Sequence, residues 1–160
     1  MPPITAILHT SNDGLRLGRA LETLHPCDEI LVIDHGSTDQ TLRVAREYAA
    51  TVHALGPGQS ARDQILMARH PWVLFVLPSE SLSEALEAAL FEWKLHDERE
   101  VAEVTACSVL LREETADGWT DLHPTTRLIP RSWKAWEDNL PRHDPRSIML
   151  EGGLLRFYLP

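Results

Sequence analysis

The sequence is short of the features that mark several common classes of protein. It has only two cysteines among 160 residues, Cys27 and Cys107, which match no C-x-x-C spacing. We expect them to be small apolar residues in a reducing compartment, since nothing suggests a disulfide framework. The eight histidines are dispersed and form neither H-x-x-x-H nor H-E-x-x-H, so their spacing predicts no metal site.

Long hydrophobic runs and excess basic charge are missing as well. The longest apolar stretch, residues 72–77, is far below the roughly 20 residues that span a bilayer. The first three residues lack the positive charge of a signal peptide, so we expect a cytoplasmic protein without a transmembrane segment. The 24 acidic residues outnumber the 15 basic ones and give a net charge of −9, which argues against nucleic acid as a partner.

The composition that is present fits one compact domain over residues 1–160, with 43% hydrophobic and 24% charged residues. Strand-like apolar runs alternate with helical spacing in the first half. The strand-like runs are residues 4–8, 30–33, 51–54 and 72–77, and the helical stretches are 15–24, 41–49, 59–68 and 85–93. This alternation predicts an α/β fold, with a mostly parallel sheet and helices on both faces.

Two candidate capping boxes lie in this half, Ser37 with Gln40 and Ser81 with Glu84. The second half differs, because residues 101–112 alternate loosely and are compatible with one long strand or a hairpin arm. A short strand is predicted at residues 127–130, and a last edge strand at 150–158 that could pair with another chain. We therefore expect a small antiparallel portion at the C-terminal end of the sheet.

In a sheet of this kind, ligands bind beyond the carboxyl ends of the strands. The sequence D-E-I-L-V-I-D-H-G-S-T-D, residues 28–39, places Asp34 at such an end. Its carboxylate could accept hydrogen bonds from the base or ribose of a nucleoside. The alternative is that Asp34 and Asp39 only stabilise the start of the following helix.

The order I-T-A-I-L-H-T-S-N-D followed by D-E-I-L-V-I-D-H-G-S-T-D-Q-T-L resembles the family-2 glycosyltransferases. The branch that adds sugars to lipopolysaccharide core is the most similar in appearance, and the resemblance covers about the first 90 residues. It implies a GT-A fold and a nucleotide-diphosphate sugar, such as a UDP-sugar, as donor. It further implies that Thr10 and Asp34 bind the nucleotide.

The resemblance also bears on two residues near that site. Arg62 could contact the diphosphate, because a guanidinium binds phosphate oxygens well. The alternative is that Arg62 is a solvated helix residue. His35 replaces the Asp or Ser usual in the family and could contact the base, or face solvent in a turn.

The sequence departs from the family after the fourth predicted strand. Where the family carries D-x-D, this chain has Leu77-Pro78-Ser79-Glu80, which offers few hard oxygen ligands. We therefore expect no metal-binding residues here, and Mg²⁺ or Mn²⁺ as cofactor is doubtful. Glu80 is interpreted as a residue that caps the following helix, with metal binding as the alternative.

A transfer that inverts the sugar needs a carboxylate base within reach of the acceptor hydroxyl. The segment Trp133-Lys134-Ala135-Trp136-Glu137-Asp138-Asn139 is the comparable place in this chain. Glu137 or Asp138 is the candidate base, and the alternative is a surface acid pair beside two tryptophans.

Taken together, these features predict a glycosyltransferase that moves sugar to a glycan or lipid-linked acceptor. Residues 1–93 would form the nucleotide-binding half and residues 94–160 a shortened acceptor half. The alternative is a degenerate member that binds nucleotide, glycan or a partner transferase without turnover. Sequence alone specifies neither the sugar nor the acceptor nor the oligomeric state.

Overall fold

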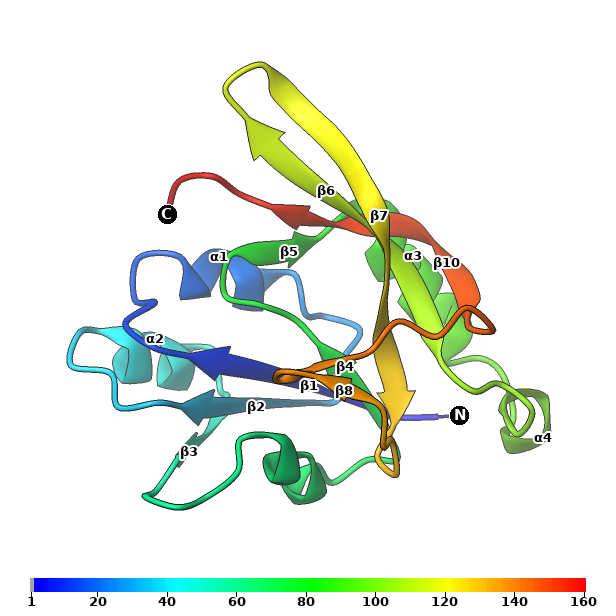
Figure 1. The fold of residues 1–160 in the computed structure, drawn as a ribbon, viewed down its shortest axis with the longest axis horizontal. Helices are drawn as coiled ribbons and strands as arrows, with labels where there is room; N and C mark the ends of the chain where they lie inside the picture. The colour runs from blue at the N-terminus through cyan, green and yellow to red at the C-terminus, as the bar shows by residue number, and fades with distance from the viewer. Residues whose placement is uncertain (1) are drawn as a thin grey trace.

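The computed structural model describes residues 2–160, which fold around one curled, eight-stranded sheet (Figure 1). The strand order is β3-β2-β1-β4-β7-β6-β10-β5. The first-half elements are β1 (Ile4–Thr10), α1 (Leu17–Glu22), β2 (Glu29–Asp34), α2 (Thr41–Glu47), β3 (Thr51–Ala54), a 3-10 helix (Arg62–Met67), β4 (Trp72–Phe75), β5 (Glu80–Leu82) and α3 (Glu84–Trp93). The second half adds α4 (Glu98–Val101), β6 (Cys107–Thr115), β7 (Gly118–Pro130), β8 (Trp136–Glu137), β9 (Leu140–Pro141) and β10 (Ile148–Arg156).

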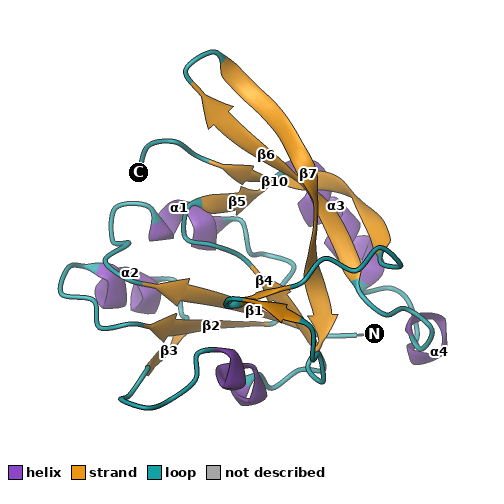
Figure 2. Cartoon of the chain, viewed as in Figure 1, coloured by secondary structure: helices purple, strands orange, loops and turns teal. Residues whose placement is uncertain are grey.

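Strands β3, β2, β1 and β4 are mutually parallel, as the alternating pattern predicts. Strand β7 is antiparallel to both β4 and β6, and β5 is antiparallel to β10. The predicted α/β class, with a mostly parallel sheet and an antiparallel C-terminal portion, is therefore confirmed (Figure 2).

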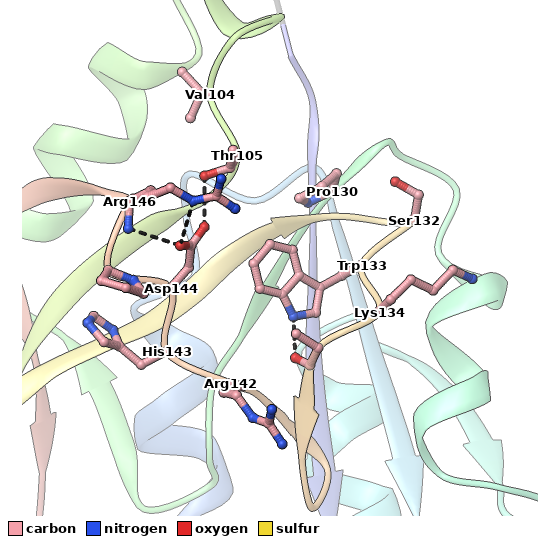
Figure 3. Close-up of a pocket in the computed structure, with 12 residues that line it drawn as sticks. Val104, Thr105, Pro130, Ser132, Trp133, Lys134, Arg142, His143, Asp144 and Arg146 are labelled. Atoms are coloured by element: carbon pink, nitrogen blue, oxygen red, sulfur yellow. Dashed lines mark hydrogen bonds and ion pairs between the residues drawn. The ribbon is translucent and has the colours of Figure 1, made fainter.

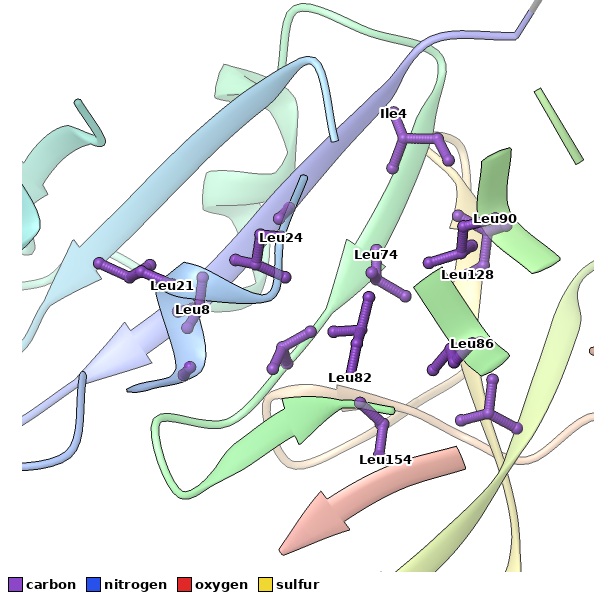
Figure 4. Close-up of a cluster of buried hydrophobic side chains, with 14 of the residues drawn as sticks. Ile4, Leu8, Leu21, Leu24, Leu74, Leu82, Leu86, Leu90, Leu128 and Leu154 are labelled. Atoms are coloured by element: carbon purple, nitrogen blue, oxygen red, sulfur yellow. The ribbon is translucent and has the colours of Figure 1, made fainter. Parts of the chain in front are cut away.

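The two faces of the sheet are covered differently. The three helices α1, α2 and α3 pack on one face, over a cluster of buried side chains (Figure 4). Its labelled members are Ile4, Leu8, Leu21, Leu24, Leu74, Leu82, Leu86, Leu90, Leu128 and Leu154. The 3-10 helix and the small β8–β9 hairpin cover the other face, with Ile65 and Trp136 against Phe75 and its neighbours.

Strand β10 is not the edge strand that the sequence predicts. It lies between β6 and β5, and its bulge between Met149 and Gly153 brings it against α3. A Cβ on Gly152, at φ +81°, would meet the backbone nitrogen of Leu86 at 2.3 Å. Only glycine allows this close approach of β10 to α3. Strand β5, and not β10, forms that edge of the sheet.

Both predicted capping boxes are wrong in detail. The cap of α3 is Ser83, whose side chain accepts from the amide of Leu86, while Ser81 lies on β5. Helix α2 begins at Thr41 without a side-chain cap, and the hydroxyl of Ser37 instead donates to Asp34. Residues 101–112 are not one strand, because Val101 ends α4 and β6 starts at Cys107. The hairpin arm, which was the other alternative, is present from Cys107 onward, since β6 pairs antiparallel with β7 across the turn between Thr115 and Gly118.

Candidate functional site

Strands β1 and β2 end side by side, with Thr10 paired in register with Asp34. The Thr10 hydroxyl donates to Asp34 Oδ1 over 2.8 Å, and the Ser37 hydroxyl donates to the same oxygen over 2.6 Å. The amide of Ser37 donates to Oδ2 over 2.9 Å. Burial alone would raise the pKa of Asp34, but the hydrogen bonds from Ser37 and Thr10 outweigh it and lower the pKa. Asp34 is thus an ionised carboxylate held by neutral donors.

The loops that follow β1 and β2 are bonded to each other. The amide of Asn12 donates to the Ser37 hydroxyl over 2.9 Å, and Asn12 Oδ1 accepts from the amide of Thr38 over 2.8 Å. Asp39 accepts from the amide of Gly14 over 3.0 Å and also bonds Thr41. These contacts fix the rim of the crevice at the carboxyl ends of the two strands.

A cavity of about 410 Å³ opens at this rim. Its lining comes from β1 and the loop after it, from His35, from the β4–β5 loop and from the tip of the β8–β9 hairpin. The lining residues are His9, Thr10, Ser11, Asp13, Arg16, His35, Leu77, Pro78, Ser79 and Asn139. The structure therefore places Thr10 and His35 on the cavity wall, whereas Asp34 lies directly behind Thr10 and is 3% exposed.

His9 and His35 lie next to each other on the wall of the cavity. His9 Nδ1 lies 3.0 Å from His35 Nε2, and the His9 ring is stacked on Phe75 at 6.4 Å between centroids. Burial and the neighbouring His35 lower the pKa of His9 to about 4. His9 is therefore neutral near pH 7. The sequence did not predict His9 as a residue of the site.

The end of β4 has no exposed carboxylate. Leu77, Pro78 and Ser79 line the cavity but supply at most one neutral hydroxyl. Glu80 is completely buried, and its carboxylate forms a two-pronged ion pair with Arg127 at 2.7 and 3.0 Å. It also accepts from Arg156 at 3.2 Å and from the amide of Leu77 at 2.8 Å.

This arrangement contradicts the interpretation of Glu80 as a helix cap, since the Glu80 carboxylate is buried and paired with Arg127 and Arg156. Burial alone would raise the pKa of Glu80, but the charge and hydrogen bonds of Arg127 keep it below its ordinary value. Arg127 and Arg156 were missed as partners because they lie 47 and 76 residues away. A hint was available, since Arg127 is a single charge at the start of an apolar strand segment.

The β8–β9 hairpin carries the predicted base candidates. Glu137 and Asp138 are exposed and line a second cavity of about 330 Å³, whose wall includes His123, His143 and Arg156. The next residue, Asn139, lines the crevice of Thr10, so the hairpin tip separates the two cavities.

Arg62, predicted near the diphosphate, approaches this hairpin tip from the 3-10 helix. Its Nε donates to the backbone carbonyl of Asp138 over 2.5 Å, while its side chain stays exposed. Arg62 does not line the cavity beside Thr10, so the structure brings it to the candidate base and not to the candidate nucleotide site.

A third cavity, about 490 Å³, lies at the base of the same hairpin (Figure 3). Trp133 and Pro130 line it on one side, and Arg146 and Asp144 on the other. Asp144 accepts from Thr105 at 2.9 Å and from the amide of Arg146, which ties its carboxylate to the loop. This cavity adjoins Pro130, which pairs with Trp72 at the start of β4, so it lies at the other end of that strand from the crevice.

Within residues 2–160 no three histidine, cysteine or acidic side chains gather closely enough to hold a metal ion. The same part of the chain contains no helix long and apolar enough to cross a membrane. Cys27 and Cys107 are both free thiols, and Cys107 is buried.

Comparison with solved structures identifies the fold. The fold matches solved glycosyltransferases of the GT-A type, so the predicted fold is confirmed. Staphylococcus aureus TarS superposes with a TM-score of 0.54 at 23% identity, over 72% of this chain and 23% of that chain. Glucosyl-3-phosphoglycerate synthase from Mycobacterium tuberculosis, in complex with Mn²⁺, UDP and glucosyl-3-phosphoglycerate, gives 0.54 at 19% identity, over 69% of this chain and 44% of that one.

Glycosyltransferases are also found among the proteins that are similar in sequence. The chain is 28% identical over 98 residues to the lipopolysaccharide core biosynthesis glycosyltransferase LpsC of Rhizobium meliloti, covering 56% of this chain and 36% of the relative. It is 33% identical over 92 residues to an uncharacterized glycosyltransferase of Rickettsia felis, covering 54% and 32%. No protein-family profile matches. The predicted resemblance to family-2 glycosyltransferases is thus confirmed, and the chain spans about a third of the length of these curated relatives.

Proposed function

We propose that the chain is a glycosyltransferase domain that transfers sugar from a nucleotide-diphosphate donor to a glycan or lipid-linked acceptor. The observation that carries the proposal is the Thr10–Asp34 pair at the carboxyl ends of β1 and β2, beside a cavity of about 410 Å³. That position is where open parallel sheets bind their ligands. Sequence relatives that are named glycosyltransferases support it, as does a structural neighbour that was solved with Mn²⁺, UDP and glucosyl-3-phosphoglycerate.

In this proposal the nucleoside lies against Thr10 and His35, and Asp34 acts from behind. Asp34 holds the hydroxyl of Thr10 and the amide of Ser37 in fixed directions. None of the hydrogen-bond partners of Asp34 is a cation. The uncompensated negative charge of Asp34 therefore attracts a hydrogen-bond donor of the nucleoside, such as a base N–H or a ribose hydroxyl.

Glu137 and Asp138 are proposed as the general base for the acceptor hydroxyl. The base takes the hydroxyl proton as the oxygen attacks the sugar carbon and the bond to the diphosphate breaks. Their position at a hairpin tip, two residues and one residue before the crevice residue Asn139, supports this role. We further propose that residues 94–160 supply the acceptor side, that residues 1–93 supply the nucleotide side, and that the domain works in the cytoplasm.

UDP is the probe for the nucleotide site, and its binding is measured by thermal unfolding with and without Mn²⁺. A ligand at a hundred times its Kd adds about 2.7 kcal/mol to stability. We expect stabilisation by UDP in the wild type and in Asp117→Asn, an exposed control on the β6–β7 turn, and its loss in Asp34→Asn. Equal stabilisation of all three proteins would refute the assignment of the crevice.

Turnover separates an active transferase from a degenerate binder. Loss of a general base typically slows a reaction about 10²- to 10⁴-fold. We expect hydrolysis or transfer of a UDP-sugar to fall by that factor in Glu137→Gln or Asp138→Asn, with UDP binding retained. UDP binding without any turnover in the wild type would favour the degenerate alternative.

A further inference from the structure

His9 and His35 lie side by side in the crevice, and the proposed transfer uses only His35 of the two. The two residues come from neighbouring strands, His9 near the end of β1 and His35 directly after β2. Both rings are partly exposed and both line the cavity of about 410 Å³, so a small solute reaches them from solvent.

The separation of the two nitrogens suits a shared ion. Nitrogen ligands lie about 2.0–2.1 Å from Zn²⁺, so two of them at angles of about 90° to 110° are about 2.9–3.4 Å apart. His9 Nδ1 and His35 Nε2 are 3.0 Å apart, which falls in this range. In the hydrogen bond the two nitrogens point at each other, so binding one ion between them requires each ring to turn by roughly 40° toward a common point.

The surroundings define what kind of ion fits. The carboxylate nearest in sequence, Asp34, is already engaged by Thr10 and Ser37, and Asp13 is paired with Arg16 at 2.6 Å. Hard carboxylate ligands, which Mg²⁺ and Ca²⁺ require, are therefore committed elsewhere. Two imidazoles instead favour borderline ions such as Zn²⁺, Co²⁺ and Ni²⁺.

We propose that His9 and His35 form a two-imidazole site for a borderline divalent transition metal ion in the crevice. Two protein ligands leave at least two positions of a tetrahedral ion open to solvent or ligand. Phosphate oxygens in the same cavity could fill them, and this second step rests on the proposed function. The ion then supplies positive charge in a crevice where Leu77, Pro78 and Ser79 supply no metal ligand of their own beyond one hydroxyl.

Calorimetric titration of the untagged protein with ZnCl₂ tests the site without any nucleotide. We expect one Zn²⁺ per chain in the wild type, and at least about ten-fold weaker binding in His9→Gln and in His35→Asn, since even changes behind a metal ligand cost 10- to 100-fold. His35→Asn keeps a side chain that can hydrogen-bond His9, and thermal unfolding of each variant checks its fold.

His25→Ala is the matched control. His25 is exposed and precedes β2, so it lies at the end of the parallel strands away from the crevice. Its Zn²⁺ affinity should equal that of the wild type, and MgCl₂ should give no comparable binding. Equal Zn²⁺ affinity in the wild type, His9→Gln and His35→Asn would overturn the proposal.

A repeat titration in the presence of UDP tests the second step separately. If the phosphates complete the coordination, UDP tightens Zn²⁺ binding in the wild type, and Zn²⁺ tightens UDP binding by the same factor. Zn²⁺ binding that UDP leaves unchanged would retain the two-histidine site and refute its link to the donor. Failure of UDP to bind under any condition would instead count against the proposed function.

Discussion

Strands β2 and β4 end at the same crevice, yet the carboxylates that follow them have opposite environments. Asp34 is bonded by hydroxyls and an amide, without a cation among its hydrogen-bond partners. Glu80 is bonded by two guanidinium groups, with Arg127 2% and Arg156 30% exposed. Asp34 holds the crevice residue Thr10 through neutral donors, whereas Glu80 pairs its charge with two guanidinium groups inside the protein.

This difference separates binding from architecture within one sheet. Arg127 also donates to the carbonyl of Phe75, and Arg156 lies on β10, so Glu80 joins the end of β4 to β7 and β10. The β4–β5 loop is thereby fixed over a cluster with one negative and two positive side chains. The loop that would carry metal ligands in the family here lines the crevice with Leu77, Pro78 and the hydroxyl of Ser79.

The largest expected effect is on Glu80. Removing one partner of a buried ion pair leaves uncompensated charge and typically costs about 3–5 kcal/mol. We expect Glu80→Ala to lower the free energy of unfolding by that amount in urea denaturation. Asp121→Ala, which breaks the exposed pair with Arg112, should cost less than about 1 kcal/mol. Similar losses in both variants would contradict the structural role of Glu80.

Lowering the pH should reduce the contribution of the same Glu80 cluster to folding stability. Because the pKa of Glu80 is lowered in the folded state, its contribution is present at neutral pH. That contribution is lost as the pH falls below about 4.3, the ordinary value for Glu, and through the folded-state pKa.

Comparing wild type with Glu80→Gln isolates this titration. The stability of the wild type should fall more steeply below about pH 4.5, by up to about 1.4 kcal/mol per pH unit, because one proton fewer is bound in the folded state. Urea unfolding from pH 7 to pH 3 measures both curves. Parallel curves over that range would show that Glu80 does not titrate with folding.

How much of the structure the sequence predicts depends on how far apart the interacting residues lie along the chain. The four parallel strands were predictable because each is a local apolar run, and residues 51–54 match β3 at both ends. Thr10 and His35 were predicted at the crevice, and the structure places both on the wall of one cavity.

What the sequence did not predict involves partners far apart in the chain. Glu80 was interpreted as a cap because its neighbours suggested a helix start, while its partner Arg127 is 47 residues away. The same holds for His9, whose partner His35 is 26 residues away, and for the hairpin tip that brings Asn139 to Thr10. No local periodicity encodes such contacts, because they arise only when the sheet curls and the second half packs on it.

The smallest expected effect tests whether carboxylates introduced at the end of β4 can bind a metal ion in the crevice. Leu77 and Ser79 line the crevice and are partly exposed, so carboxylates placed there would face solvent and ligand. The double variant Leu77→Asp with Ser79→Asp adds hard oxygen ligands of the kind that Mn²⁺ and Mg²⁺ bind. Loss of the apolar contacts of Leu77 should cost about 1 kcal/mol of stability.

In this double variant UDP binding should become dependent on Mn²⁺. We expect Mn²⁺ to tighten UDP binding about ten-fold, or about 1.4 kcal/mol, because the ion bridges the new carboxylates and the diphosphate. Ser79→Asp alone is the control and should show a smaller gain, since one carboxylate holds the ion weakly. Titration of UDP with and without Mn²⁺ measures the effect in each protein. If Mn²⁺ leaves UDP affinity unchanged in the double variant, the end of β4 does not face the diphosphate, and the crevice binds its nucleotide in another orientation.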